Sequence, residues 1–435
     1  MVVTTTTPFT KMVNEMSSLK KQLSSNIIVL FLLNIGNALA YLFQLFIARQ
    51  MVPTEYGEFN SLNSLMMVLS AASSAVPMIT ARFIVPAAVQ SQGHIRGVLD
   101  AGLRIMGVVG LAVVLIGGVA IPWLQDYLHV NDLLILVMVL LICGLTLVYS
   151  VPIGVLQGTG RYIPMSMVIN SVPGGRLLGA IVLVGWMGMG LRGAILGCLL
   201  SCLLAFSLGM SYLRNLYRHP AETIPEMSFT ELWNCARPLV LGTTLIVFLG
   251  NIDVIFVRHY CEPVISGLYA TASIIGRIAN LFPGVLISLL FPEVVREGNR
   301  GDGNTHILWI NLGLTVAIGG GISLLFTLWP QYIIVTLMGE SYRQSGNYLG
   351  IIAFTMAILA VCNTVFTYLL GRGDYRSLYI LSTGSIVFVI LVMIYHDSPQ
   401  TIIHLLLGSL VGVCVIAALR LGRASGKATS VLRQG

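Results

Sequence analysis

The chain has 435 residues, of which 56% are hydrophobic and only 9% are charged, and its mean hydropathy is +0.88. Soluble domains carry about 25% charged residues, so this composition excludes an ordinary globular core and indicates a membrane protein. The formal net charge of +7 is attributed to loop charges that set membrane orientation and contact anionic lipid, and not to nucleic-acid binding.

Twelve apolar runs follow one another along the chain, and each is close to the ~20 residues that a helix needs to cross the hydrocarbon. The sequence therefore predicts an all-α polytopic membrane protein with twelve transmembrane helices. The runs are 26–48, 60–80, 101–121, 133–153, 165–185, 192–213, 238–257, 268–290, 307–329, 346–369, 377–395 and 401–419.

The first run is preceded by a polar, Thr-rich segment that ends near Lys20 and Lys21. The run itself carries Asn34, Asn37 and Gln44, which are three to seven residues apart and so fall broadly on one side of a helix. Such amides either hydrogen-bond to neighbouring helices or face a polar cavity. The sequence leaves both alternatives open.

Two polar turns recur at nearly the same offset. The turn Arg49–Phe59 after the first run is similar to Arg258–Tyr269 after the seventh, since each begins with Arg, contains a Pro and reaches a Gly two residues before an aromatic residue. Gly158–Tyr162, after the fourth run, is similar to Gly371–Tyr375, after the tenth. The offsets, about 210 and 213 residues, indicate a duplicated unit of six spans. An even number of spans keeps the two copies parallel, related by a pseudo-two-fold axis along the membrane normal.

The repeat and the loop charges together predict the organisation of the chain. The polar connection between the sixth and seventh runs is the longest in the chain, and it contains Pro220 and Pro225. Eighteen of the 24 Lys and Arg residues fall on the side that both termini share, and four fall on the other, so we expect both termini to be cytoplasmic. The expected parts are an N-terminal tail 1–25, an N-lobe 26–213, a cytoplasmic linker 214–233, a C-lobe 234–419 and a C-terminal tail 420–435.

Three charges lie deep within apolar runs, namely Arg176, Asp253 and Arg277. A charge at membrane depth costs about 2.5–3.5 kcal/mol on insertion scales, so such residues usually face a bundle interior or a wet cavity. One interpretation is an ion pair between Asp253 and an arginine that only holds helices together. The other is a cavity with surplus positive charge, which recruits an anion such as phosphate, pyrophosphate or an acidic sugar, because guanidinium binds phosphate through two bonds and stays charged.

Motifs for catalysis are absent from the sequence. It contains no P-loop, no GxSxG elbow and no zinc spacing, and no segment outside the runs reaches 30 residues. Six of the seven cysteines fall in or beside predicted spans, so neither a disulfide framework nor a metal site is predicted. We therefore predict a transporter and not an enzyme, without a cofactor or metal.

Several short motifs, taken in order, resemble one family. They are Tyr56-Gly57-Glu58-Phe59, Gly154–Tyr162, Asn251–Arg258, Gly267-Leu268-Tyr269, Arg277 and Leu290-Phe291-Pro292. In these motifs the chain is similar to the oligosaccharide flippases, the O-antigen and capsule repeat-unit translocases of the multidrug/oligosaccharidyl-lipid/polysaccharide exporter superfamily. The resemblance covers nearly the whole chain.

This resemblance implies a MATE-like fold, in which two six-helix lobes form a V around a central cavity. It implies alternating access that carries a polyprenyl-pyrophosphate-linked oligosaccharide from the inner to the outer leaflet of the bacterial inner membrane, for exopolysaccharide, capsule or O-antigen synthesis. The implied partners are membrane lipids and polysaccharide polymerase machinery, with no nucleic acid. A proton gradient, a sodium gradient or the membrane potential would drive the cycle.

On this hypothesis Arg176 and Arg277 hold the pyrophosphate or acidic sugars, Arg82 guides the head group in, and Asp253 couples transport to an ion. Asn34, Asn37, Gln44 and Asn251 are the predicted polar lining of the cavity. One alternative is a cation-coupled antiporter for drugs or small organic cations, in which Asp253 dominates. Another is a membrane-embedded polymerase or ligase, which usually needs larger outer loops than this chain has.

Overall fold

The structure, a computed structural model, describes residues 35–222, 229–281, 283 and 306–431. Within them ten helices are long and apolar enough to cross a membrane, and eleven if the bent pair Val240–Leu249 and Ile252–Tyr260 forms one span. These eleven overlap the second to twelfth predicted runs, which confirms the all-α polytopic class. The first run is described from residue 35 onwards and is helical over 35–50, so the total of twelve stays a prediction.

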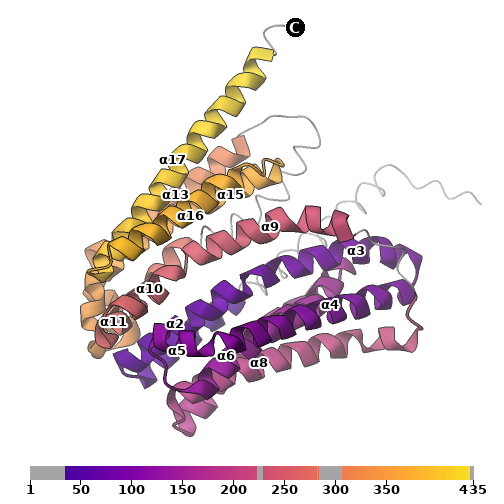
Figure 1. The fold of residues 1–435 in the computed structure, drawn as a ribbon, viewed down its shortest axis with the longest axis horizontal. Helices are drawn as coiled ribbons and strands as arrows, with labels where there is room; N and C mark the ends of the chain where they lie inside the picture. The colour runs from indigo at the N-terminus through magenta and orange to yellow at the C-terminus, as the bar shows by residue number, and fades with distance from the viewer. Residues whose placement is uncertain (1–34, 223–228, 282, 284–305, 432–435) are drawn as a thin grey trace, which may run out of the picture.

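The N-terminal half forms one group of helices, coloured indigo to magenta in Figure 1. Its second span is interrupted by a short 3₁₀ turn, Ala71–Ala75, one residue before Pro77. Proline cannot donate a backbone hydrogen bond, so an interruption at this point is expected. The helices are α2 (Pro53–Ser70), α3 (Val76–Gln90), α4 (Gln92–Val119), α5 (Ile121–Leu128), α6 (Leu133–Gly158), α7 (Tyr162–Gly179), a π-helical continuation (Ala180–Trp186), α8 (Gly190–Leu213) and a 3₁₀ turn (Arg214–Arg218).

The C-terminal half forms a second group, coloured pink to yellow. Its helices are α9 (Phe229–Leu249), α10 (Ile252–Tyr260), α11 (Pro263–Gly276), α13 (His306–Leu328), α14 (Pro330–Met338), a 3₁₀ turn (Glu340–Ser345), α15 (Gly346–Gly371), α16 (Ser377–Ile394) and α17 (Pro399–Val431). The last helix runs past residue 419, where the predicted span ends, and projects beyond its neighbours toward the C-terminus in Figure 1.

Helix ends follow local sequence signals. Pro53, Pro263 and Pro330 each begin a helix, a position where the missing N–H of proline has no intrahelical partner to lose. The side chain of Ser91 accepts a hydrogen bond from the backbone of His94 and so caps α4. Such caps fix where the chain turns between successive spans.

The two halves meet at one end of the bundle in Figure 1, and away from that end α15, α16 and α17 diverge from the N-terminal helices. Helix α9 stays against the N-terminal half, where it packs on α2 and on the Ala71–Ala75 turn. At the joined end, α2 packs on α10 and α11, and α5 packs on α10. This end carries the short helices α5 and α14, and we refer to it as the α5/α14 end. The loop charges predict that it lies outside the cell.

The predicted linker begins on the N-terminal half. Glu222 lies 2.7 Å from the His94 ring nitrogen Nδ1, and its backbone N–H donates to the carbonyl of Gly93. Residues 214–222 therefore lie against the start of α4. Residues 223–228 lie outside the described part of the chain. The domain boundaries themselves stay a prediction.

Candidate functional site

Asp253 stands at a helix break. The chain bends by 43° between α9 and α10, and Asp253 occupies the first turn of α10, where the positive end of the helix dipole favours a carboxylate. Its side chain is 0% exposed. The Tyr269 hydroxyl donates to Oδ2 at 2.7 Å, and the Ser273 hydroxyl donates to the same oxygen at 3.4 Å.

Arg277 follows directly after α11 and faces this carboxylate. Its Nη2 lies 3.6 Å from Asp253 Oδ1, and its side chain is 15% exposed. A Cβ at Gly276 would stand 2.6 Å from the Ile352 side chain on α15, so glycine is what lets α11 approach that helix just before Arg277. The predicted ion pair between Asp253 and an arginine is therefore present, and that arginine is Arg277.

The pair is electrostatic without being hydrogen-bonded. Among the described residues, Nε and Nη2 of Arg277 and Oδ1 of Asp253 are all buried and have no hydrogen-bond partner. Buried polar groups are normally hydrogen-bonded, so such an unsatisfied set requires an explanation. Two guanidinium donors thus remain able to bind an additional acceptor.

The opposite half of the molecule also contributes to this site. The Arg277 charge acts on Tyr41, in the helix 35–50, and on Tyr56, on α2. The Tyr56 hydroxyl donates to Gln44 Oε1 at 3.4 Å. Because α11, which ends directly before Arg277, packs on α2 of the N-terminal half, residues of both halves lie near this site.

The predicted polar lining falls into different environments. Gln44 is buried and bonded to Tyr56. Asn251 is buried at the helix break and donates to the Val247 carbonyl at 2.8 Å, while its Oδ1 has no partner within the described part of the chain. Asn37 is half-buried in the first span, and Asn34 lies outside the described residues.

Arg176 lies on α7, and the groups on which its charge acts, Cys198, Cys202 and Tyr149, belong to α8 and α6 of the same half. Its Nε is buried and has no hydrogen-bond partner among the described residues. No carboxylate pairs with it among the described residues. The hypothesis of one cavity lined by both arginines therefore gains no support from their placement, because periodicity fixes depth along a span and not the direction in which a side chain points.

Arg82 is exposed on α3, and its role as a guide for the head group stays a prediction. In the described part of the chain, no group of three or more His, Cys, Asp or Glu side chains is placed to hold a metal ion.

Sequence reasoning does not identify the side chains that hold Asp253. The Tyr269 hydroxyl makes the shortest hydrogen bond to Asp253 among the described residues, although the sequence places Tyr269 only in the repeated turn and in the Gly267-Leu268-Tyr269 motif. Its counterpart in the first copy of the turn is Phe59, because each lies two residues after the glycine. The repeat therefore gives no signal for Tyr56.

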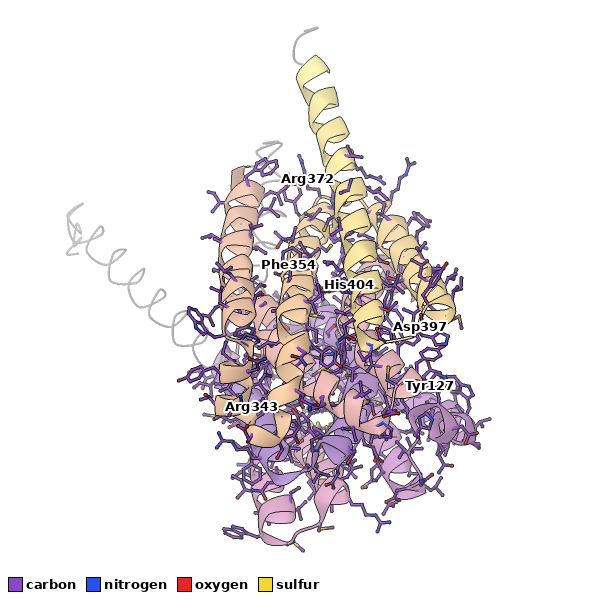
Figure 2. All side chains as sticks on the ribbon, turned by 90° about the vertical axis from the view of Figure 1, so that its left-hand side faces the viewer. Tyr127, Arg343, Phe354, Arg372, Asp397 and His404 are labelled. Carbon is purple, nitrogen blue, oxygen red and sulfur yellow. The ribbon has the colours of Figure 1, made fainter. Side chains whose placement is uncertain are left out.

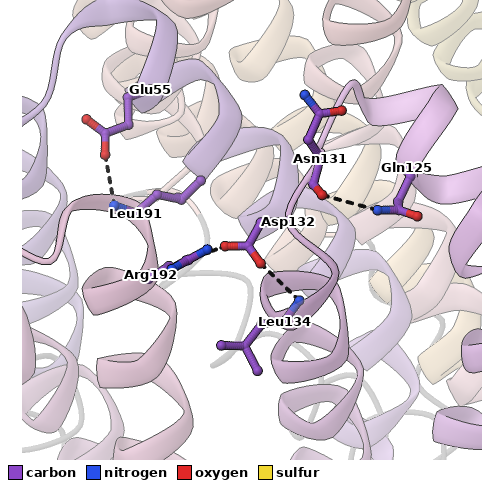
Figure 3. A network of polar contacts seen from close by, with 7 residues as sticks. All are labelled: Glu55, Gln125, Asn131, Asp132, Leu134, Leu191 and Arg192. Carbon is purple, nitrogen blue, oxygen red and sulfur yellow. Dashed lines mark hydrogen bonds and ion pairs between the residues drawn. The ribbon is translucent and has the colours of Figure 1, made fainter.

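A second polar network lies at the α5/α14 end of the N-terminal half (Figure 3). Glu55 accepts from the Leu191 backbone at 2.8 Å, and Asp132 pairs with Arg192. The hydrogen bond from Arg192 lowers the pKa of the Asp132 carboxyl. These contacts join three turns of one half, so we assign them to structure and not to transport.

We expect Tyr269→Phe to destabilise the protein. The change removes the hydroxyl that holds Oδ2 of a fully buried carboxylate, and a hydrogen bond to a charged group contributes about 1.5–3 kcal/mol. Thermal unfolding in detergent would measure the loss. Tyr379→Phe is the matched control because Tyr379 is exposed; equal unfolding temperatures for the two variants would contradict the assigned role.

Comparison with known proteins completes the description of the site. Residues 23–296, more than half of the chain, match the family model described as "Polysaccharide biosynthesis protein". The comparison with curated proteins finds no match.

Solved structures share the fold. An inward-facing multidrug resistance MATE family transporter of the MOP superfamily gives a TM-score of 0.73 at 13% identity, covering 91% of this chain and 95% of that one. The lipid II flippase MurJ in an inward closed conformation gives 0.67 at 13% identity, covering 90% and 87%. An outward-facing MATE family transporter gives 0.64 at 13% identity, covering 94% and 96%. These matches confirm the predicted MATE-like fold.

Proposed function

Because the chain belongs to the polysaccharide biosynthesis protein family, we propose that it is a flippase that translocates a polyprenyl-pyrophosphate-linked oligosaccharide across the bacterial inner membrane. Transport would run from the cytoplasmic to the outer leaflet by alternating access, in the synthesis of a surface polysaccharide. The fold shared with MOP-superfamily transporters supports the transport of a substrate over an enzymatic role.

The observation that carries the proposal is the state of Arg277. Arg277 follows α11, which packs on α2 of the N-terminal half. Its guanidinium has two buried donors that have no hydrogen-bond partner among the described residues, and its only carboxylate neighbour in that part of the chain stands at 3.6 Å. A pyrophosphate offers several anionic oxygens, and guanidinium binds such groups through two parallel hydrogen bonds. The substrate head group would satisfy donors that Asp253 leaves open.

Asp253 is the proposed coupling residue. When a phosphate binds Arg277, it neutralises part of the positive charge that balances the Asp253 carboxylate. Tyr269 and Ser273 still donate hydrogen bonds to the other carboxylate oxygen. A proton or sodium ion could then compensate it. The membrane potential offers a further drive, because moving one charge through 100 mV is worth about 2.3 kcal/mol.

The other predicted residues keep narrower roles in this proposal. Arg82, exposed on α3, would attract the head group before it reaches Arg277. Arg176, which contacts α6 and α8 in the N-terminal half, would act on acidic sugars or on the conformation of that half. Polymerase machinery would receive the translocated substrate on the far side.

Complementation in cells tests the function. A bacterial strain lacking its own repeat-unit flippase accumulates lipid-linked oligosaccharide in the inner leaflet, and we expect this chain to restore surface polymer in a strain whose repeat unit it accepts. A panel of strains with neutral and acidic repeat units would identify the class of glycan. Failure to restore polymer in every strain, with the protein present in the membrane, would refute the proposal.

The antiporter alternative is tested in the same cells. It predicts efflux of a fluorescent organic cation that depends on Asp253 and tolerates Arg277→Ala. This geometry supports the flippase, since Arg277 already offsets the charge of Asp253, the one carboxylate paired with it among the described residues. Cation efflux without polymer export would reverse that preference.

A further inference from the structure

Two arginines, one from each half, reach across the boundary between the halves at the α5/α14 end. Arg49 belongs to the N-terminal half, and its Nε and Nη2 donate to the carbonyls of Leu337 at 3.2 Å and Thr336 at 2.9 Å. Arg258 belongs to the C-terminal half, and its Nε and Nη2 donate to the carbonyls of Leu128 at 2.9 Å and His129 at 3.2 Å. Each arginine therefore binds the opposite half through two backbone carbonyls.

The two contacts correspond in the arginine and in one of its two acceptors. Arg258 and Leu337 follow Arg49 and Leu128 by 209 residues in each case, and in both contacts Nε bonds the leucine carbonyl. The acceptors lie at the ends of corresponding short helices, α14 and α5. The duplication that the repeated turns predict is thus present as a pair of reciprocal contacts.

The receiving helices end in the same manner. His129 follows α5 with φ of 51° and is the one non-glycine residue with positive φ in the described part of the chain, and Gly339 follows α14 with φ of 107°. A left-handed residue after a helix ends it abruptly and leaves its last carbonyls without intrahelical partners. Those carbonyls carry the negative end of the helix dipole, which suits a guanidinium.

Two glycines bring the halves into backbone contact between the arginines. A Cβ on Gly57 would stand 2.7 Å from the Cα of Gly267, and a Cβ on Gly267 would stand 1.8 Å from the carbonyl oxygen of Pro53. Neither position can accept a side chain while the halves are joined. Gly57 and Gly267 occupy matching places in the repeated turns, so they share in the same duplication.

Further contacts bury the Arg258 contact more deeply than the Arg49 contact. Arg258 is 5% exposed and lies 3.7 Å from Glu58, while its neighbour His259 contacts the Tyr127 carbonyl at 3.0 Å and stacks on the Tyr127 ring at 3.8 Å. Arg49 is exposed. On that side the Tyr342 hydroxyl donates to the Met51 carbonyl at 2.8 Å. The Arg258 contact is therefore the more enclosed one.

We infer that Arg49 and Arg258 form a duplicated clasp that holds the two halves together at the α5/α14 end, and that both contacts must open before the molecule opens on this side. The four hydrogen bonds of the clasp go to backbone acceptors, so they depend on the placement of α5 and α14. Only Arg258 adds a side-chain partner, Glu58, among the described residues. The inference rests on the two-half architecture and holds whatever the substrate is.

Distances between spin labels in the full-length protein in lipid nanodiscs test the clasp. With the native cysteines replaced, Trp123→Cys on α5 and Tyr332→Cys on α14 provide exposed label sites, one on each half. We expect a single short distance for the otherwise unchanged chain. Arg49→Ala should raise the fraction at a longer distance by about tenfold, because water replaces part of the two hydrogen bonds of this exposed side chain and leaves about 1.4 kcal/mol to be lost.

Matched variants keep the result interpretable. Arg49 is exposed, so its replacement leaves folding intact, and Arg49→Ala with Arg258→Ala should open the end further than either alone. Arg343→Ala is the control, because Arg343 lies at the same end (Figure 2) but pairs with Glu340 within one turn. Gly267→Ala should favour the open form by preventing closure. An unchanged distance distribution in the Arg49 and double variants would overturn the inference.

Discussion

Arg277→Ala is expected to reduce export of surface polymer by about 100-fold or more. Two charge-assisted hydrogen bonds to a phosphate contribute about 3–6 kcal/mol together, and each 1.4 kcal/mol is a factor of ten. Arg277→Lys should recover only part of the activity, because an ammonium keeps the charge but cannot form two parallel hydrogen bonds. Polymer quantified per cell, in the complemented strain, is the measurement.

Protein amount must be separated from transport in this experiment. Arg277→Ala also leaves Asp253 buried without its partner, so polymer is compared at equal amounts of folded protein in the membrane. Arg343→Ala is the matched control, because its side chain is 60% exposed and its ion pair stays within one 3₁₀ turn. Normal polymer from Arg277→Ala would show that Arg277 does not hold the substrate.

Asp253→Ala is expected to destabilise the protein by about 3–5 kcal/mol, because removing one partner of a buried ion pair leaves the other charge uncompensated. The double variant with Arg277→Ala should be more stable than Asp253→Ala alone, since no isolated charge remains. Unfolding in detergent for the four proteins of this cycle gives the coupling energy between the two residues.

The same cycle separates stability from function. The double variant should remain inactive in polymer export although its stability recovers, because the cation that binds the substrate is gone. If the losses of unfolding free energy in the two single variants add in the double variant, the 3.6 Å contact between Arg277 and Asp253 contributes no coupling energy. That outcome would remove the coupling role proposed for Asp253.

Much of the fold follows from the sequence because it depends on apolar length. The eleven spans in the described part of the chain overlap the predicted runs, and the repeated turns correctly indicate a duplication that is seen in the contacts of Arg49 and Arg258. The apolar part of the last helix ends at Arg420, while the helix itself continues to Val431, so the start of the C-terminal tail stays a prediction. Helices extend past the hydrocarbon wherever nothing ends them, and no proline or glycine stop follows residue 419 directly.

The site was predicted less completely than the fold. The depth of a charge within an apolar run indicates Asp253 and Arg277, which the structure places together. The same criterion indicates Arg176, whose neighbours lie within one half. Hydropathy carries no information about which neighbour a side chain faces. Its position after the seventh apolar run assigns Arg258 to a loop, whereas the structure buries it at the boundary between the halves. A sequence shows no contacts between distant turns.

Translocation in reconstituted liposomes tests the central claim most directly. Purified protein is placed in vesicles that contain a fluorescent polyprenyl-pyrophosphate oligosaccharide, and a membrane-impermeant reagent reports how much of it changes leaflet. We predict rapid translocation by the unchanged chain and by Arg343→Ala, and a rate near that of empty vesicles for Arg277→Ala. Equal rates for the unchanged chain and empty vesicles, or for the unchanged chain and Arg277→Ala, would contradict the account.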